Sequence, residues 1–442
     1  MTTIKLTKRK TNHRYGLTLL LLSFIVWIVY WLQMLSANVD TSHHEEEKHI
    51  QKRHTPTDFR FPTDMNLNIQ SDPDHDEALS NIMQANVHLI DFQFHGFDLK
   101  DSIPYSATAK FCHLDWSQHK QNPSIVPMFK DLIHQSPSCS KTIIYKDLYQ
   151  AVQAARKYDA QHKGKIQVMY PPRGIVFHES RVGSTLAANT LAAFQPERNR
   201  VYSESPPPIT AAKLYENSNH PEQAIQFLQD VIYLMSRSND TQERDTFFKI
   251  QSIGTKSLHV FRKAFPQTPW IFIFREPVQV MMSHLKTKDT KSAVCLRSRS
   301  RPDDDLKQIV QKSLGTSIGI QDLSVEEFCA AHLSTLCHKA RDEVLDSNGF
   351  GKVVNYINLQ EQLMEHIIPK HFLRGQDGDE LDQDAKQRAY RVGEKYSKGR
   401  QEEKIWKEDS RAKENAAWPE LQRASETFLL PIYEQLQELA TK

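Results

Sequence analysis

Four residues in one short segment have the types and the spacing of an anion-binding loop. The segment from Ile175 to Leu186 reads IVFHESRVGSTL, an apolar run followed by an arginine, a glycine and two hydroxyl residues. Free N–H groups and the dipole at the start of a helix attract anions, a glycine lets the backbone come close, and an arginine supplies charge. The alternative is an ordinary strand-to-helix junction with a surface arginine. The residues expected to hold a phosphate-like group are Arg181, Val182, Gly183, Ser184 and Thr185.

A second segment, about 90 residues later, has the character of another phosphate site. From Phe272 to Ser283 the chain reads FIFREPVQVMMS, with Arg275 directly after an apolar run and Ser283 eight residues beyond it. An arginine at the carboxyl edge of a strand and a hydroxyl two turns along the next helix can hold one phosphate from two sides. A salt-bridged arginine and a buried helix serine are the simpler alternative.

In this order, the two segments resemble the donor-binding motifs of sulfotransferases that use 3′-phosphoadenosine 5′-phosphosulfate. In that family an Arg or Lys precedes Gly by two residues in the 5′-phosphosulfate loop, and an Arg with a Ser eight residues later binds the 3′-phosphate. The resemblance covers residues 170–442. It implies a P-loop NTPase-like fold, and transfer of a sulfuryl group from this co-substrate, without a metal, to a hydroxyl or amine acceptor such as a carbohydrate.

The sequence indicates less clearly which group would take the acceptor's proton than which residues would bind the donor. Cytosolic members of the family use a histidine on the strand that here reads FFKIQ, where this chain has Lys249 and then Gln251. Membrane-bound carbohydrate sulfotransferases commonly use a glutamate, and Glu204 in YSESPPP is the favoured candidate. A surface carboxylate beside a polyproline turn is its alternative reading, and His178 and Glu179 are the alternative bases. Lys249 is expected to act with the phosphosulfate loop on the leaving phosphate.

A further segment near the C-terminus is loosely similar to the Lys-Gly loop with which the family covers its donor. It reads YSKGR from Tyr396 to Arg400. The resemblance assigns Lys398 and Arg400 to donor binding.

Alternating strand and helix patterns surround these residues. Apolar runs predict strands at Gly174–His178, Thr246–Gln251, Trp270–Phe274 and Lys352–Ile357. The helices predicted around them cover 184–194, Pro221–Ser236, 255–265, Val278–Leu285, a long helix opened by the capping box at Ser324, and most of 410–440. This alternation predicts an α/β fold with a parallel sheet flanked by helices.

The N-terminal region predicts a membrane anchor. Residues 17–35 are almost entirely apolar and follow five basic residues, enough for one crossing with the N-terminus in the cytosol. We therefore expect a cytosolic tail (1–16), a transmembrane helix (17–35), a stem (36–76), an extension (77–169) and the sulfotransferase-like part (170–442). The expected location is the Golgi membrane, single-pass type II, with a lumenal catalytic domain. A cleaved signal peptide is the alternative.

The net charge and the cysteines further limit the classes of protein to which this chain can belong. The net charge of +2 gives no basic field of the kind that binds nucleic acid. Lumenal placement permits disulfides, and the five cysteines favour Cys112 with Cys139, and Cys295 with either Cys329 or Cys337. No zinc-binding spacing occurs.

Two other functions stay open at this point. A lumenal glycosyltransferase would carry a metal-binding D-x-D, for which 303–305 (DDD) is a candidate, although these residues more simply begin a helix. A catalytically silent nucleotide-binding protein of the same fold would explain why the family's histidine is replaced at Gln251.

Overall fold

The computed structural model describes residues 75–97, 103–145, 147–286, 293–374, 383–398, 400 and 405–441. The predicted tail, membrane helix and stem at 1–74 lie outside the described residues. Within the described ranges, no helix combines the length and apolar character that a membrane crossing needs.

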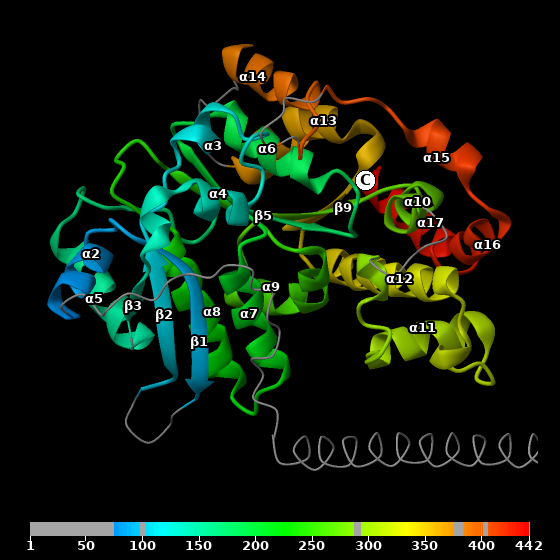
Figure 1. Cartoon of the computed structure of the whole chain (residues 1–442), viewed down its shortest axis with the longest axis horizontal. Helices are drawn as coiled ribbons and strands as arrows, with labels where there is room; N and C mark the ends of the chain where they lie inside the picture. Colours follow the sequence, from blue (N-terminus) through cyan, green and yellow to red (C-terminus); the bar gives the residue numbers. More distant parts are fainter. Residues whose placement is uncertain are drawn as a thin grey trace, which may run out of the picture. The chain divides into compact units, whose positions relative to one another are not determined.

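A parallel sheet of five strands forms the centre of the described structure (Figure 1) and confirms the predicted α/β class. The strands lie in the order β10-β9-β5-β8-β6, so the first of them along the chain is the middle one. Their bounds are Gly174–His178 for β5, Asn199–Ser203 for β6, Asp245–Lys249 for β8, Trp270–Phe274 for β9 and Gly351–Asn355 for β10.

Both faces of this sheet are covered, because alternate side chains of each strand enter different cores. In β9, Phe272 packs into the core formed with α7, α8 and α9, whereas Ile273 packs into the core formed with α6, α10 and α16. Figure 1 shows α6, α13 and α14 on one side of β5 and β9, with α7, α8 and α9 on the other. Burial on both faces explains why β5 and β9 read as apolar runs.

The helices that cover the sheet follow the strands in chain order. Their bounds are Ser184–Phe194 (α6), Pro206–Glu216 (α7), Pro221–Met235 (α8), Leu258–Ala264 (α9), Pro277–Leu285 (α10), Asp304–Leu314 (α11), Val325–Leu345 (α12), Leu359–Gln362 (α13) with a π-helix at Leu363–Phe372, Gln383–Gly393 (α14), Ser410–Ala416 (α15), Pro419–Phe428 (α16) and Leu430–Ala440 (α17).

The residues before β5 form a small antiparallel sheet with helices. The bounds are His75–Met83 (α2), His88–Gly96 (β1), Ser106–Cys112 (β2), Ser117–Gln121 (α3), Phe129–Gln135 (α4), Ile143–Tyr145 (β3) and Leu148–Gln161 (α5), and a two-stranded pair joins β4 (Gln167–Val168) to β7 (Arg237–Ser238). The ring of Phe92 lies 5.0 Å from that of Phe227 in α8. Tyr105 donates a hydrogen bond of 2.8 Å to buried Asp230, also in α8. This part therefore shares a core with the helices of the larger sheet.

One strand of the five-stranded sheet, β6, was not predicted from the sequence patterns. β6 ends at Ser203, and the prolines that follow begin α7. Polar residues obscure this strand: buried Asn199 donates to the Leu191 carbonyl at 2.7 Å, and buried Arg200 pairs with Glu243. Buried polar side chains with partners cannot be distinguished by sequence from exposed ones.

The disulfides agree with the predicted pairing and settle the open choice. Cys112 is bonded to Cys139, and Cys295 is bonded to Cys329. Cys337 is a buried free thiol. The two predicted strands at Thr246–Gln251 and Lys352–Ile357 are each shifted in the structure, which leaves Gln251 and Ile357 beyond the strand ends.

Candidate active site

The loop between β5 and α6 is held in an unusual backbone conformation. Ser180, Arg181 and Gly183 have φ angles of 125°, 58° and 76°. Positive φ is uncommon for non-glycine residues, and clusters of such residues occur at ligand-binding turns. Gly183 is the N-cap of α6, and no side chain caps this helix. Because no side chain caps α6, its first N–H groups can donate to an anion.

Tyr356 packs against both predicted phosphate segments. A Cβ atom on Gly183 would lie 2.3 Å from the Tyr356 ring, so no side chain fits there. The guanidinium carbon of Arg275 lies 4.1 Å from the centre of the same ring. Tyr356 follows the last residue of β10 directly. It was missed in the sequence, where it lies inside the predicted strand Lys352–Ile357 and no motif marks it as a site residue.

Arg275 lies at the carboxyl end of β9, as predicted, and is bound by side chains of two helices. Its Nε donates to Gln279 at 2.7 Å and its Nη2 donates to Ser410 at 2.9 Å. Asp409 provides the nearest carboxylate, 3.6 Å from Nη2. Ser283 donates its hydroxyl hydrogen to the Gln279 carbonyl at 2.7 Å. Arg275 and Ser283 thus both donate a hydrogen bond to Gln279.

The two helix starts differ in their capacity for anions. Glu276 caps α10 by accepting hydrogen bonds from Val278 and Gln279. An anion beside Arg275 would therefore be held by side chains, whereas an anion at Arg181 can also use the uncapped start of α6.

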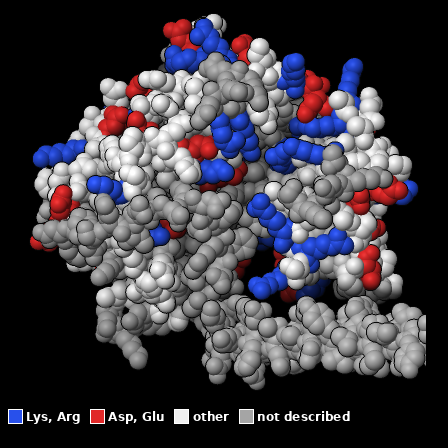
Figure 2. Space-filling model, in the orientation of Figure 1, with Lys and Arg blue, Asp and Glu red and all other residues white. Residues whose placement is uncertain are grey.

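Several cations are gathered around these two segments. Burial, together with the charges of Lys249 and Arg181, lowers the pKa of Lys398 to about 8, although Glu204 opposes this shift. Burial also lowers the pKa of Lys413, where Arg275 and Arg181 add to the effect and Asp409 opposes it. Figure 2 shows Lys and Arg side chains gathered over the part of the surface where α10, α13 and α15 lie. Within the described residues, Arg181 makes no ion pair. Because these cations repel one another, a bound anion stabilises the group.

The predicted catalytic residues lie on adjacent strands. Lys249 ends β8, Glu204 follows β6, and the Lys249 ammonium forms an ion pair with the Glu204 carboxylate. The His178 Nε2, at the end of β5, lies 3.9 Å from the same carboxylate. The Glu204 side chain is 26% exposed and that of Lys249 is fully buried. The φ of Glu204 is 58°, so this residue too is in a conformation that its surroundings must enforce.

Burial and the neighbouring charges set the protonation of this group. Burial alone would raise the pKa of Glu204, but Lys249, with His178 and Lys398, together outweigh it and lower the pKa to about 2. Burial, together with Lys249, lowers the pKa of His178 to about 3. Glu204 is therefore a carboxylate and His178 a neutral imidazole at neutral pH. Both can accept a proton, and only Glu204 is partly exposed.

The function of this protein is inferred from the geometry of the site. No model of a known protein family matches the chain, and no curated protein matches it significantly.

The loosely predicted segment after α14 lies beside α6. Asn189 of α6 donates to the Ser397 carbonyl at 3.1 Å, and Lys398 lies close enough to Glu204 to affect its pKa. Arg400 is directed elsewhere: its N–H donates to the Ser124 carbonyl at 3.0 Å, and its Nε lies 3.2 Å from Asp131. Lys398 therefore belongs to the cluster of cations, whereas Arg400 holds the segment to Ser124 and Asp131.

The other candidates make contacts within the fold. Glu179 is 2% exposed and its pKa is raised to about 8 by burial, and it accepts the Arg275 N–H at 3.4 Å. Gln251 donates to the Glu204 carbonyl at 3.3 Å. Asp303 accepts from the Leu306 N–H as the cap of α11 and pairs with Lys256. In the described ranges no group of three metal-ligating side chains is found, there or elsewhere.

Proposed function

We propose that this protein is a sulfotransferase of P-loop NTPase-like fold that uses 3′-phosphoadenosine 5′-phosphosulfate. The observation that carries the proposal is the convergence at one sheet edge of Arg181, Arg275 and the Lys249–Glu204 pair. Ligands of open α/β sheets bind at the carboxyl ends of the strands, where neighbouring crossovers run in opposite directions. The central position of β5 creates such a point, with β8 on one side and β9 on the other.

The residues fit a donor with two separate anionic ends. The uncapped start of α6 and Arg181 suit the phosphosulfate end, where backbone N–H groups can surround the oxygens. Arg275 with Ser283 suits the 3′-phosphate, which would replace Asp409 as the anionic partner. The lowered pKa values of Lys398 and Lys413 support this fit, because an added anion relieves the repulsion between the cations.

The proposed reaction forms one bond and breaks one. The acceptor oxygen, or nitrogen for an amine, bonds to the donor sulfur, and the bond from sulfur to the bridging phosphate oxygen breaks. The electron pair stays on that oxygen, and 3′,5′-adenosine bisphosphate leaves. Arg181, Lys249 and the N–H groups of α6 stabilise this negative charge. The acceptor's proton passes to the Glu204 carboxylate.

The ion pair also links donor binding to base strength. A carboxylate with a pKa of about 2 is a weak base, and Lys249 contributes most among the charges that lower this pKa. When Lys249 turns its charge to the phosphosulfate, less of that charge acts on Glu204. The pKa of Glu204 then rises toward the range in which a general base is effective.

We propose a Golgi location for the enzyme, with residues 17–35 as the membrane anchor and the catalytic part in the lumen. The two disulfides of the described residues support an oxidising compartment. A hydroxyl or amine acceptor on a glycan fits that location.

Two measurements on the full-length protein test the proposal. Calorimetry with 3′,5′-adenosine bisphosphate should show binding, and labelled donor should pass its sulfuryl group to a member of a panel of glycans, proteins and small alcohols. Binding without any turnover would support a silent nucleotide-binding protein. If the nucleotide does not bind but a nucleotide sugar does, the glycosyltransferase alternative replaces the proposal.

A further inference from the structure

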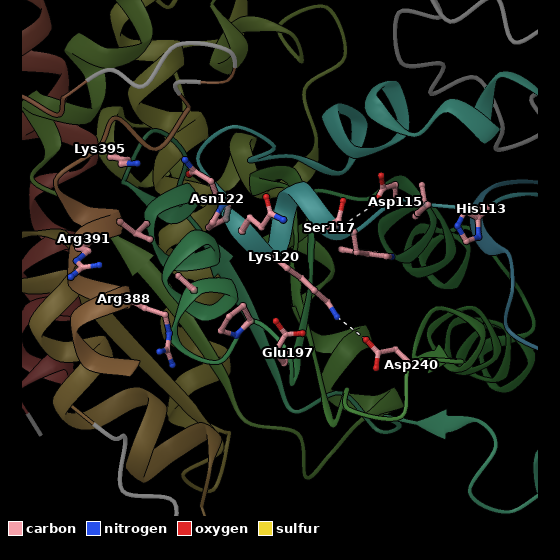
Figure 3. A pocket seen from close by; sticks show the side chains of 17 residues that line it. His113, Asp115, Ser117, Lys120, Asn122, Glu197, Asp240, Arg388, Arg391 and Lys395 are labelled. Carbon is pink, nitrogen blue, oxygen red and sulfur yellow. Dashed lines mark hydrogen bonds and ion pairs between the residues drawn. The ribbon is translucent and has the colours of Figure 1, made fainter. Parts of the chain in front are cut away.

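A cavity of about 720 Å³ lies away from the phosphate segments, between α3, the end of α6 and α14 (Figure 3). Its size is within the range of about 300–1,000 Å³ that is usual for small-molecule sites. Eleven of its seventeen lining residues are polar or charged, which disfavours an apolar alcohol as its occupant. The proposed function does not account for this cavity.

The walls of the cavity carry opposite charges. Figure 3 shows Arg388, Arg391 and Lys395, from α14 and just beyond it, on one side. Asp115 and Asp240 lie on the other, with Lys120 paired to Asp240 at 2.9 Å. Glu197 and Arg391 are exposed, and neither forms an ion pair with another described residue. A ligand there can offer an anion to one wall and hydrogen-bond donors to the other.

Two segments lead from the cavity to the proposed reaction site. Lys395 lines the cavity, and three residues later Lys398 lies beside Glu204. Pro123 lines it too, and Met128 of the same segment accepts a hydrogen bond from Ser203, the residue before Glu204. The two segments are joined by a hydrogen bond from the Arg400 N–H to the Ser124 carbonyl. The cavity lies near the start of β6, whereas Glu204 follows its end, so these segments run from the cavity toward the reacting group.

The separation between the two places indicates an extended ligand. Ala193 lines the cavity and comes nine residues after Ser184 at the anion position. At 1.5 Å per residue the two ends of α6 are about 14 Å apart. A single sugar cannot fill the cavity and present its hydroxyl to Glu204 at once, whereas a chain of several sugars can.

We propose that this cavity is an acceptor subsite for an acidic oligosaccharide, whose anionic groups face Arg391 and whose hydroxyls face Asp115 and Glu197. An acidic peptide is disfavoured because the carboxylates of the second wall would repel it and receive few donors in return. The acceptor role rests on the proposed sulfotransferase function, whereas binding of the saccharide does not. The cationic segment from Arg388 to Lys398 then guides the chain toward the reacting group.

The test uses the full-length protein in detergent and a chondroitin tetrasaccharide as the probe. Binding should be measurable without donor, and Arg391→Glu should weaken it by about tenfold, because two unit charges then repel instead of attract. The carboxyl-reduced tetrasaccharide should bind more weakly than the acidic form. Arg423→Glu on α16, which is exposed and absent from the cavity, is the matched control and should change nothing.

The outcomes separate this inference from the proposed function. If Arg391→Glu binds the tetrasaccharide as well as the wild type does, or if the neutral form binds equally, the inference is wrong. An acidic peptide that binds as tightly and responds equally to Arg391→Glu also overturns the saccharide assignment. Affinity for 3′,5′-adenosine bisphosphate should be the same in both variants. If the nucleotide fails to bind while saccharide binding responds to Arg391, the cavity assignment stands and the donor assignment falls.

Discussion

The ammonium of Lys249 contacts the carboxylate of Glu204 across two adjacent strands. The pair is supported by the backbone, because the Glu204 N–H donates to the Lys249 carbonyl at 2.8 Å. The lysine is enclosed and the glutamate is partly exposed, so the carboxylate is the member that an acceptor can reach.

Replacement of Glu204 by glutamine should lower turnover by about 10²–10⁴-fold, which is the usual contribution of a positioned general base. Glutamine keeps an oxygen for the buried Lys249 ammonium, so binding of 3′,5′-adenosine bisphosphate should stay near the wild-type value. Turnover with labelled donor and calorimetry give the two quantities. His178→Ala is the control, and full activity in Glu204→Gln with none in His178→Ala would make His178 the base.

The donor assignment predicts opposite effects for two neighbouring residues. Arg275→Ala should weaken 3′,5′-adenosine bisphosphate binding by at least about tenfold, because the phosphate loses a charged, buried partner. Asp409→Asn should leave the affinity unchanged or increase it, since the competing carboxylate 3.6 Å from Arg275 is removed.

Arg181→Ala completes this comparison, because its partner is the reacting end of the donor. It should lower turnover more than it lowers binding of the product nucleotide. Equal affinity in wild type and Arg275→Ala, with the fold intact, would remove the 3′-phosphate assignment.

Gly183→Ala should both destabilise the fold and reduce nucleotide binding. The φ of 76° costs an alanine about 1–2 kcal/mol, and its Cβ would also lie 2.3 Å from the Tyr356 ring. Gly315→Ala is a matched control, with a φ of 88° and nothing within 4 Å of the added carbon. Urea unfolding should show the larger loss for Gly183→Ala, and Tyr356→Ala in the same chain should restore part of it. Equal losses in the two alanine variants would contradict the contact.

Glu179 should make the protein less stable as the pH rises. Its folded pKa is about 8 because of burial, against an ordinary value of 4.5. Between these values the unfolded chain releases a proton that the folded chain keeps, so the free energy of unfolding falls with rising pH. Below pH 4.5 both states hold the proton and the effect vanishes.

Glu179→Gln stays neutral and should remove this part of the pH dependence. Urea unfolding at pH 5 and pH 8, followed by tryptophan fluorescence, compares the two proteins. The variant should lose less stability than the wild type between these two values. Identical losses would mean that Glu179 is not protonated in the folded protein.

The membrane anchor predicted at residues 17–35 is tested by protease protection in sealed microsomes. The basic flank before the apolar run should keep the N-terminus in the cytosol, so the C-terminal part should be protected until detergent is added. Digestion of that part in intact microsomes would contradict a lumenal catalytic domain.

Local patterns were sufficient for the parts of the fold that carry the two phosphate segments. The bounds of β5, α6 and β9 agree with the predicted Gly174–His178, 184–194 and Trp270–Phe274. Strands buried on both faces have no polar positions to interrupt them, and Gly183 and Pro277 mark the helix starts. Arg275 follows β9 directly and Arg181 comes three residues after the end of β5, so their place at the carboxyl edge was predictable as well.

The rest was decided by tertiary structure. Strand β6 could not be recognised because its buried polar residues find partners in distant segments. Tyr356 and Lys413 reach the site only because β10 and α15 pack beside β9 and α10. Cys295 bonds to Cys329 rather than Cys337 because the segment around Cys295 packs against α12 at that residue. The sequence by itself determined which residues begin and end β5, α6 and β9, since those choices depend on neighbours along the chain. The strand order brought Glu204 to Lys249 and placed the cavity beside α6, because contacts between residues far apart depend on packing that no local pattern contains.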